Sequence, residues 1–179
     1  MSVKNTADAA PDGASNSPNA NISLENTAEY LSAEKAALQL IARAEQNKFG
    51  LIRKLEKRGH DSLCINAVIN SLCETGMLDD SRYARLWLEL QIARKAVSPF
   101  RLLVSLVSRG IERETVESVL RETLDEETEL QLLKRYAEKL QSGKQKNHFI
   151  DDEDNKLLRY KLKTEGFSSQ AISAFFESN

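Results

Sequence analysis

Apolar residues recur every three or four positions along most of the chain, and this period predicts amphipathic helices rather than strands. The pattern is most complete over residues 78–120, where two turns separate three such segments. Asp79 is a typical N-cap residue, and Leu78 and Tyr83 have the spacing of a hydrophobic staple around it. Gly110 follows the second segment, as expected of a glycine that ends a helix. The stretch therefore predicts three short helices joined by tight turns.

The same pattern occurs three times. A leucine followed by a cap-type residue opens each copy, at spacings of 47 and 46 residues, in the pairs Leu31 and Ser32, Leu78 and Asp79, and Leu124 and Asp125. Twelve residues after a cap-type residue, a glycine ends each second helix, in the pairs Asn47 and Gly59, Ser98 and Gly110, and Asp154 and Gly166. Apolar residues keep fixed offsets from these glycines: Leu51, Leu55, Ile65, Val68, Leu102, Leu106, Val116, Val119, Leu158, Leu162, Ile172 and Phe175. These offsets predict the core face of each copy.

One three-helix copy buries little surface by itself, so the copies are expected to stack and share their apolar faces. The predicted fold is all-α, with three tandem three-helix repeats in an elongated, curved array. We expect a disordered tail over residues 1–30 and repeats over 31–77, 78–123 and 124–179. The third repeat carries a polar insertion at 141–154, which is expected to be an exposed loop.

The composition argues against several functional classes. The net charge of −2 gives no global field that would attract nucleic acid, so any such contact would need a local basic stripe. No nucleotide-binding, metalloprotease or serine-hydrolase motif occurs, and His60 and His148 fall in different repeats, so neither an enzyme nor a cofactor is expected. The absence of a long apolar run or a secretory leader predicts a cytoplasmic protein without a membrane contact.

Several residues could be structural or functional. Cys64 and Cys73 are interpreted as buried thiols, with a disulfide or metal role as the alternative. Tyr83 and Trp87 lie on the apolar side of their helix, which favours the core over base stacking. The acidic run 151–153 could ligate a metal, but acids before a helix also favour its dipole, and no calcium-loop pattern is present.

Basic residues gather at helix ends and turns of the first two repeats. The candidate contact residues for a partner or for DNA are Arg53, Lys54, Lys57, Arg58, Arg82, Arg85, Arg94, Lys95, Arg101 and Arg109. A further run in the third repeat comprises Lys156, Arg159, Lys161 and Lys163. The pattern indicates either a basic stripe that contacts phosphate or an acidic groove, or an ordinary solvated face with paired charges.

Residues 78–84, Leu-Asp-Asp-Ser-Arg-Tyr-Ala, resemble the LDDxxFA-type signature of the RecX family of recombination regulators. Pro99 with the later Arg-Gly-Ile at 109–111 resembles the second signature of that family, and residues 51–59 resemble its first-repeat helix. The resemblance extends over roughly residues 33–177, including the three-repeat layout. The chain departs from the family pattern at Asn47, Arg53, Ser98 and Ser105.

The resemblance implies a monomeric modulator of the RecA recombinase in DNA recombination, repair and the SOS response. Such proteins bind the RecA–single-stranded-DNA filament along its groove and restrain its growth, its ATP hydrolysis and strand exchange. Single-stranded DNA is a further candidate partner. An elongated helical array suits a groove, because several weak contacts then combine. Two alternatives stay open: a DNA-binding helical-repeat protein that acts without RecA, and a scaffold for an unrelated partner.

Overall fold

A computed structural model describes residues 27–141 and 152–178 of the protein. Within these ranges the chain forms α-helices and no strand, which confirms the predicted all-α class. The helices are α2 (Ala28–Arg43), α3 (Lys48–Glu56), α4 (Ser62–Glu74), α5 (Asp80–Arg94), α6 (Pro99–Val107), α7 (Arg113–Thr123), α8 (Glu126–Gln141), α9 (Asp152–Thr164) and α10 (Ser169–Glu177). None of these described helices combines the length and the apolar character needed to span a membrane.

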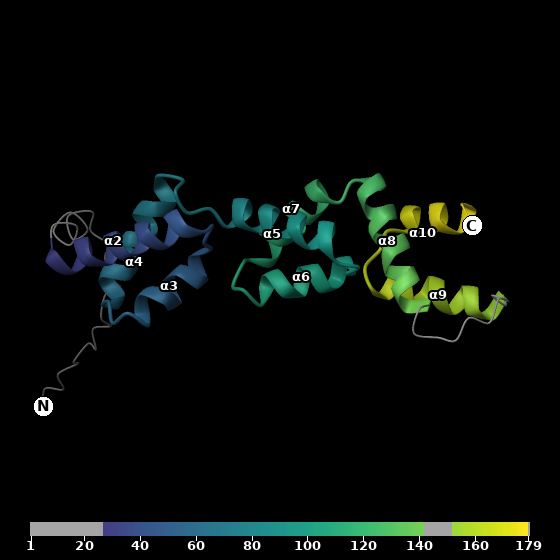
Figure 1. Cartoon of the computed structure of the whole chain (residues 1–179), viewed down its shortest axis with the longest axis horizontal. Coiled ribbons are helices and arrows are strands. Elements are labelled where there is room, and N and C mark those ends of the chain that lie inside the picture. The colour runs from purple at the N-terminus through teal and green to yellow at the C-terminus, as the bar shows by residue number, and fades with distance from the viewer. Residues whose placement is uncertain (1–26, 142–151, 179) are drawn as a thin grey trace, which may run out of the picture.

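The helices pack in three successive groups, which lie one after another along the long axis of the molecule (Figure 1). We call α2–α4 the first unit, α5–α7 the second unit and α8–α10 the third unit. Within each unit the first and third helices make the most extensive contact, and the second helix packs against the third. We infer that these units are the three repeats of the sequence, with boundaries close to residues 78 and 124.

Caps fix where most of the helices begin. The carboxylate of Asp79 accepts hydrogen bonds from the backbone N–H groups of Ser81 and Arg82, and Ser98 Oγ accepts one from that of Arg101. Asp125 accepts in the same way from the N–H of Thr128. The predicted N-cap roles of these residues are therefore confirmed. Their hydrogen bonds satisfy backbone donors that have no partner inside the helix.

The apolar offsets around the three glycines define the core. Eleven of the twelve predicted core residues are buried, and the exception, Leu158, is half-buried and packs against the same cluster. Cys64 is buried as predicted, whereas Cys73 is half-buried, and both cysteines are free thiols. Burial is the main reason that the pKa of the Cys73 thiol lies above its ordinary value. Tyr83 and Trp87 pack against the core from its margin.

The predicted helix starts were wrong at both ends of the chain. α2 begins at Ala28 with Thr27 as its N-cap, so the first helix starts a turn before the predicted pair at 31–32, and Leu31 is exposed. Thr27 Oγ1 therefore supplies the cap bond, in place of the predicted cap-type residue Ser32. α9 begins at Asp152, so Asp154 lies inside the helix rather than at its N-cap. Residues 1–26 of the predicted tail and 142–151 of the predicted insertion lie outside the described residues.

Candidate functional site

The second helices of the three units, α3, α6 and α9, lie end to end along one side of the molecule (Figure 1). We call them the second-helix row. The N-terminus of α3 meets the glycine turn that ends α6, and the N-terminus of α6 meets the glycine turn that ends α9. The positive end of one helix dipole therefore faces the negative end of the next. We call the two meeting points the first joint and the second joint.

At the first joint an aromatic ring packs against a glycine. A Cβ added to Gly110 would lie only 2.4 Å from Cγ of Phe49, so the Phe49 ring occupies the space that a side chain would need. The side chain of Asn47 does not cap its own helix but donates from Nδ2 to the carbonyl of Arg109 over 2.7 Å. Nearby, the N–H of Lys48 donates to the carboxylate of Asp80 over 2.8 Å.

At the second joint the backbone of the incoming helix, rather than an aromatic ring, lies against the glycine. A Cβ at Gly166 would lie 3.2 Å from the backbone nitrogen of Phe100 and 3.5 Å from its Cβ, and the N–H of Phe100 donates to the carbonyl of Glu165. The Glu165 carboxylate accepts from Ser98 Oγ over 2.5 Å. Burial, with a hydrogen bond to Glu165, raises the pKa of the Tyr136 phenol above its ordinary value.

The second-helix row concentrates positive charge in a chain that is slightly negative overall. The residues between each cap position and its glycine, 48–58, 99–109 and 155–165, contain eleven Lys or Arg and two Asp or Glu. All eleven basic residues are exposed: Lys48, Arg53, Lys54, Lys57, Arg58, Arg101, Arg109, Lys156, Arg159, Lys161 and Lys163. The helices that carry these residues lie along the same side of the molecule (Figure 1).

Six of the ten predicted contact residues belong to the second-helix row: Arg53, Lys54, Lys57, Arg58, Arg101 and Arg109. Arg53 and Arg109 lie over the rings of Phe49 and Trp87, at 5.8 and 5.0 Å from the ring centroids. Lys54 donates to Oε1 of Gln46, and the Arg58 guanidinium donates to the carbonyl of Ala36. The Lys57 side chain makes no hydrogen bond or ion pair with a described residue, while its backbone N–H donates to the carbonyl of Arg53.

The other four predicted residues lie outside the row and differ among themselves. Arg82 links the first two units: its guanidinium donates to Glu45 over 2.8 Å and to the carbonyls of Gly76 and Met77. Arg85 pairs with Glu122 over 2.7 Å, and its hydrogen bond lowers the pKa of that carboxyl group. Arg94 and Lys95 are exposed at the end of α5, without an ion pair to any described residue. The sequence does not distinguish these four residues. In the structure, only Arg82 among them connects the first unit to the second.

Sequence reasoning missed the aromatic side chains of the row. Phe49 and Phe100, at the same offset in the first two copies, are 44% and 53% exposed, and Tyr160 in the third copy is 69% exposed. Lys48, an exposed residue of the row, was also absent from the predicted contact residues. The recurrence of an aromatic residue two positions after Asn47 and Ser98 was a usable signal, but its meaning depended on how the units stack.

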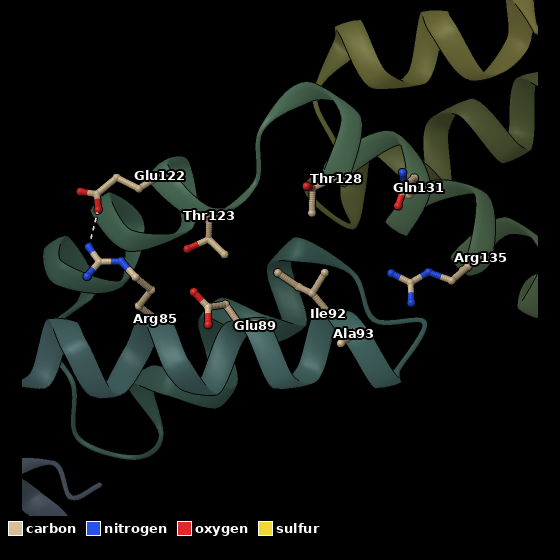
Figure 2. Close-up of a pocket in the computed structure, with 9 residues that line it drawn as sticks. All are labelled: Arg85, Glu89, Ile92, Ala93, Glu122, Thr123, Thr128, Gln131 and Arg135. Carbon is tan, nitrogen blue, oxygen red and sulfur yellow. Dashed lines mark hydrogen bonds and ion pairs between the residues drawn. The ribbon is translucent and has the colours of Figure 1, made fainter.

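A cleft of about 690 Å³ lies between α5, α7 and α8, where the second and third units meet (Figure 2). Ile92 and Ala93 form its apolar part, and the guanidinium of Arg135 points into the space beside them (Figure 2). Arg85 and Glu122 pair at the far end, and Glu89 adds a second carboxylate. The cleft therefore presents both signs of charge. Among the described residues no group of His, Cys, Asp and Glu could hold a metal ion.

Comparison with known proteins links this geometry to a family. No family model matches the chain. Regulatory protein RecX of Pseudomonas savastanoi is 35% identical over 92 residues, which are 51% of this chain and 59% of that protein. Regulatory protein RecX of Treponema pallidum is 35% identical over 108 residues, 60% of this chain and 66% of that protein. The matches thus span between about half and two thirds of the curated relatives.

The fold agrees with these matches. The crystal structure of RecX from Lactobacillus salivarius superposes with a TM-score of 0.69, covers 84% of this chain and 96% of its own, and is 19% identical. The stacked helical units and the relatives' shared name define a class of helical regulatory proteins. Within that class, the chain belongs to the RecX family, as its sequence matches and its fold agree.

Proposed function

We propose that this chain binds the RecA–single-stranded-DNA filament through its second-helix row and restrains the recombinase and its ATP hydrolysis. The observation that carries the proposal is the row itself: three helices along one side of a RecX-family protein carry eleven exposed basic residues, although the net charge of the chain is −2. The net charge alone disfavours DNA, but local charge and not net charge acts within a Debye length of a surface.

Electrostatics favour a polyanionic partner for this surface. Lysine and arginine side chains that neutralise phosphates release condensed counterions, and this gain falls as salt rises. Lys57 lies near the C-terminus of α3, at the outer end of the row, and Lys161 and Lys163 lie near the C-terminus of α9, beside the second joint. All three side chains are exposed. Binding should therefore weaken steeply as the salt concentration increases, whether the phosphates belong to filament DNA or to a free strand.

The length of the row favours a filament over a compact partner. Three short helices in succession offer contacts to neighbouring subunits of a repeating polymer, and contacts on one rigid frame combine through effective concentration. The exposed side chains of Phe100 and Tyr160 offer stacking surfaces for unpaired bases, whereas the Phe49 ring already packs against Gly110 with Arg53 over it. The row thus suits protein and single-stranded DNA together.

The test measures ATP hydrolysis by RecA on single-stranded DNA while the protein is added. The row variant carries Lys57→Glu, Lys161→Glu and Lys163→Glu, and the control variant carries Arg94→Glu, Lys95→Glu and Lys134→Glu. All six residues are exposed, and both variants change the net charge equally. We expect wild type and the control to inhibit hydrolysis and the row variant to lose most of this inhibition.

Other outcomes separate the alternatives. If the wild-type protein leaves ATP hydrolysis unchanged at equimolar or higher ratios to RecA, the inhibitory function is wrong. If the row variant and the control lose inhibition equally, the contact lies outside the row. If the wild-type protein binds bare DNA tightly and does not affect RecA, the alternative of a DNA-binding protein that acts without RecA replaces this proposal.

A further inference from the structure

The two joints are two copies of one binding site. In each, a glycine turn ends a second helix and accepts the N-terminus of another second helix. The phenylalanine two residues after the cap position approaches the glycine with its ring at the first joint (Phe49) and with its backbone and Cβ at the second (Phe100). A hydrogen bond from the incoming helix reaches the carbonyl just before the glycine, from Asn47 Nδ2 to Arg109 and from the N–H of Phe100 to Glu165. The accepting half of the site is therefore a turn of fixed shape with one backbone acceptor.

The chain contains a third copy of this accepting turn, at Gly59. The φ angle of Gly59 is 84°, equal to that of Gly110 and within 2° of the 86° at Gly166. The same two backbone hydrogen bonds close all three turns; here they run from Gly59 to Glu56 and from His60 to Leu55. No described atom lies within 4 Å of a Cβ built on Gly59, and no described group donates to the carbonyl of Arg58.

A second copy of this chain does not supply the missing half. The only second helix whose N-terminus is not already in a joint is α9, and it has Lys156 where α3 and α6 have phenylalanine. α9 also begins at Asp152, two residues before the position that matches Asn47 and Ser98. Both differences oppose head-to-tail addition of further copies, which would otherwise produce open chains.

Charge at the second joint indicates which residue the missing half would carry. The first joint has no such pair, because Gly50 and Arg109 occupy the matching positions. At the second joint the residue after the aromatic ring, Arg101, lies 3.9 Å from the carboxylate of Glu165, which precedes the glycine. At the vacant turn the residue before the glycine is Arg58, with Lys57 beside it, and both are exposed. The complementary residue in the incoming helix is therefore acidic, and an acid in the first turn of a helix also favours its dipole.

We propose that the Gly59 turn is a docking site for the N-terminus of a helix in a partner protein. The helix carries an Asn or Ser cap, an aromatic residue two positions later, and an acidic residue directly after that. Docking would lengthen the second-helix row by one helix at the α3 end. The proposal does not depend on RecA being the partner.

The probe is a peptide of residues 96–109 with Arg101→Glu, stapled between positions 104 and 108. Val104 in α6 and Ser108 at its C-cap are both exposed. The staple keeps the short peptide helical, so a lack of binding could not be attributed to an unfolded peptide. Amide chemical shifts of the full chain are followed by NMR. We expect saturable shifts centred on Gly59 and His60 at millimolar peptide, and binding roughly tenfold weaker for a Phe100→Lys peptide.

A protein variant, Arg58→Glu, supplies the charge test. It should reverse the preference, binding the peptide with the original Arg101 more tightly than the Arg101→Glu peptide. Absence of saturable shifts at Gly59, or equal binding of the Phe100→Lys peptide, would overturn the proposal. Concentration-dependent self-association that competes with the peptide would instead make a second copy the occupant, and the proposal would again be wrong.

Discussion

Each joint has a hydrogen bond to the carbonyl that precedes a glycine, but the two joints differ in the apolar packing beside them. At the second joint, apolar side chains form one continuous cluster across the second and third units, from Leu88 and Leu106 to Leu133 and Phe175. At the first joint, the first unit keeps a separate cluster around Leu55. The first unit is therefore held by Phe49 and by polar contacts, whereas the other two units share a core.

This difference in apolar packing predicts which units unfold together. Burial of apolar surface is the main source of folding stability, so units that share a cluster should share one transition. Polar contacts at a partly exposed surface contribute little net stability. We therefore expect the first unit to open independently of the other two, as a separate cooperative segment.

The largest expected effect comes from core truncation. Leu106→Ala and Leu55→Ala each remove a fully buried side chain and should each cost about 2–5 kcal/mol. Leu106→Ala should raise hydrogen exchange in both α5–α7 and α8–α10, while Leu55→Ala should raise it in α2–α4 alone. Equal loss of protection in all three units from Leu55→Ala would contradict the separation of the two clusters.

The next largest loss of stability is expected from substitution of two glycines that have the same backbone conformation. Gly59→Ala and Gly110→Ala both place a side chain at a φ of 84°, which costs about 1–2 kcal/mol. Gly110→Ala must also displace the Phe49 ring, so it should lose more in urea unfolding than Gly59→Ala and should expose α3 to exchange. If the two variants are equally stable, the aromatic contact adds nothing to the first joint.

A smaller effect is expected from the arginines beside each joint. Arg82→Ala removes a link to Glu45 and two hydrogen bonds to carbonyls, and it should cost about 1 kcal/mol because the pair is partly exposed. Arg101→Ala removes a long, exposed pair with Glu165 and should cost less than about 0.5 kcal/mol. Thermal unfolding of the two variants measures the difference, and the reverse order would refute this assignment.

The smallest effect is a pH dependence at the first joint. Desolvation is the main reason that the pKa of Asp80 is raised above its ordinary value, while its hydrogen bond from the Lys48 N–H acts in the opposite direction. A raised folded-state pKa gives a contribution that is present below about pH 4 and is lost as pH rises through the raised value. Asp80→Asn keeps an acceptor oxygen and should flatten the stability curve just above the ordinary pKa of aspartate, where this contribution is lost. An unchanged slope would show that Asp80 does not contribute to it.

Much of the fold could be predicted, because caps, glycine stops and apolar spacing are local signals. Asp79, Ser98 and Gly110 act as the sequence indicates, and the buried leucines follow from their period. The start of α2 was missed because Thr27 caps a helix whose first turn includes the exposed Leu31. Residue preference for the N-cap position does not distinguish Thr27 from Ser32, a second cap-type residue about one turn later.

The candidate site could be predicted only in part, because it arises from stacking. The basic residues are visible in the sequence, but their alignment depends on where each unit places its second helix. Asn47 shows the limit most clearly: its sequence position is that of an N-cap, yet its side chain donates to the carbonyl of Arg109 in the next unit. A contact across 62 residues leaves no local pattern.

The most direct test of the central claim is site-specific photocrosslinking on RecA-coated single-stranded DNA. A photoreactive residue replaces exposed Ser108 at the end of α6 in one variant and exposed Glu127 in the first turn of α8 in the other. α8 begins at the side of the molecule opposite α6 (Figure 1). We predict crosslinks to RecA or to the DNA from position 108 and few from position 127. Crosslinks mainly from position 127, or none from position 108, would contradict binding through the second-helix row.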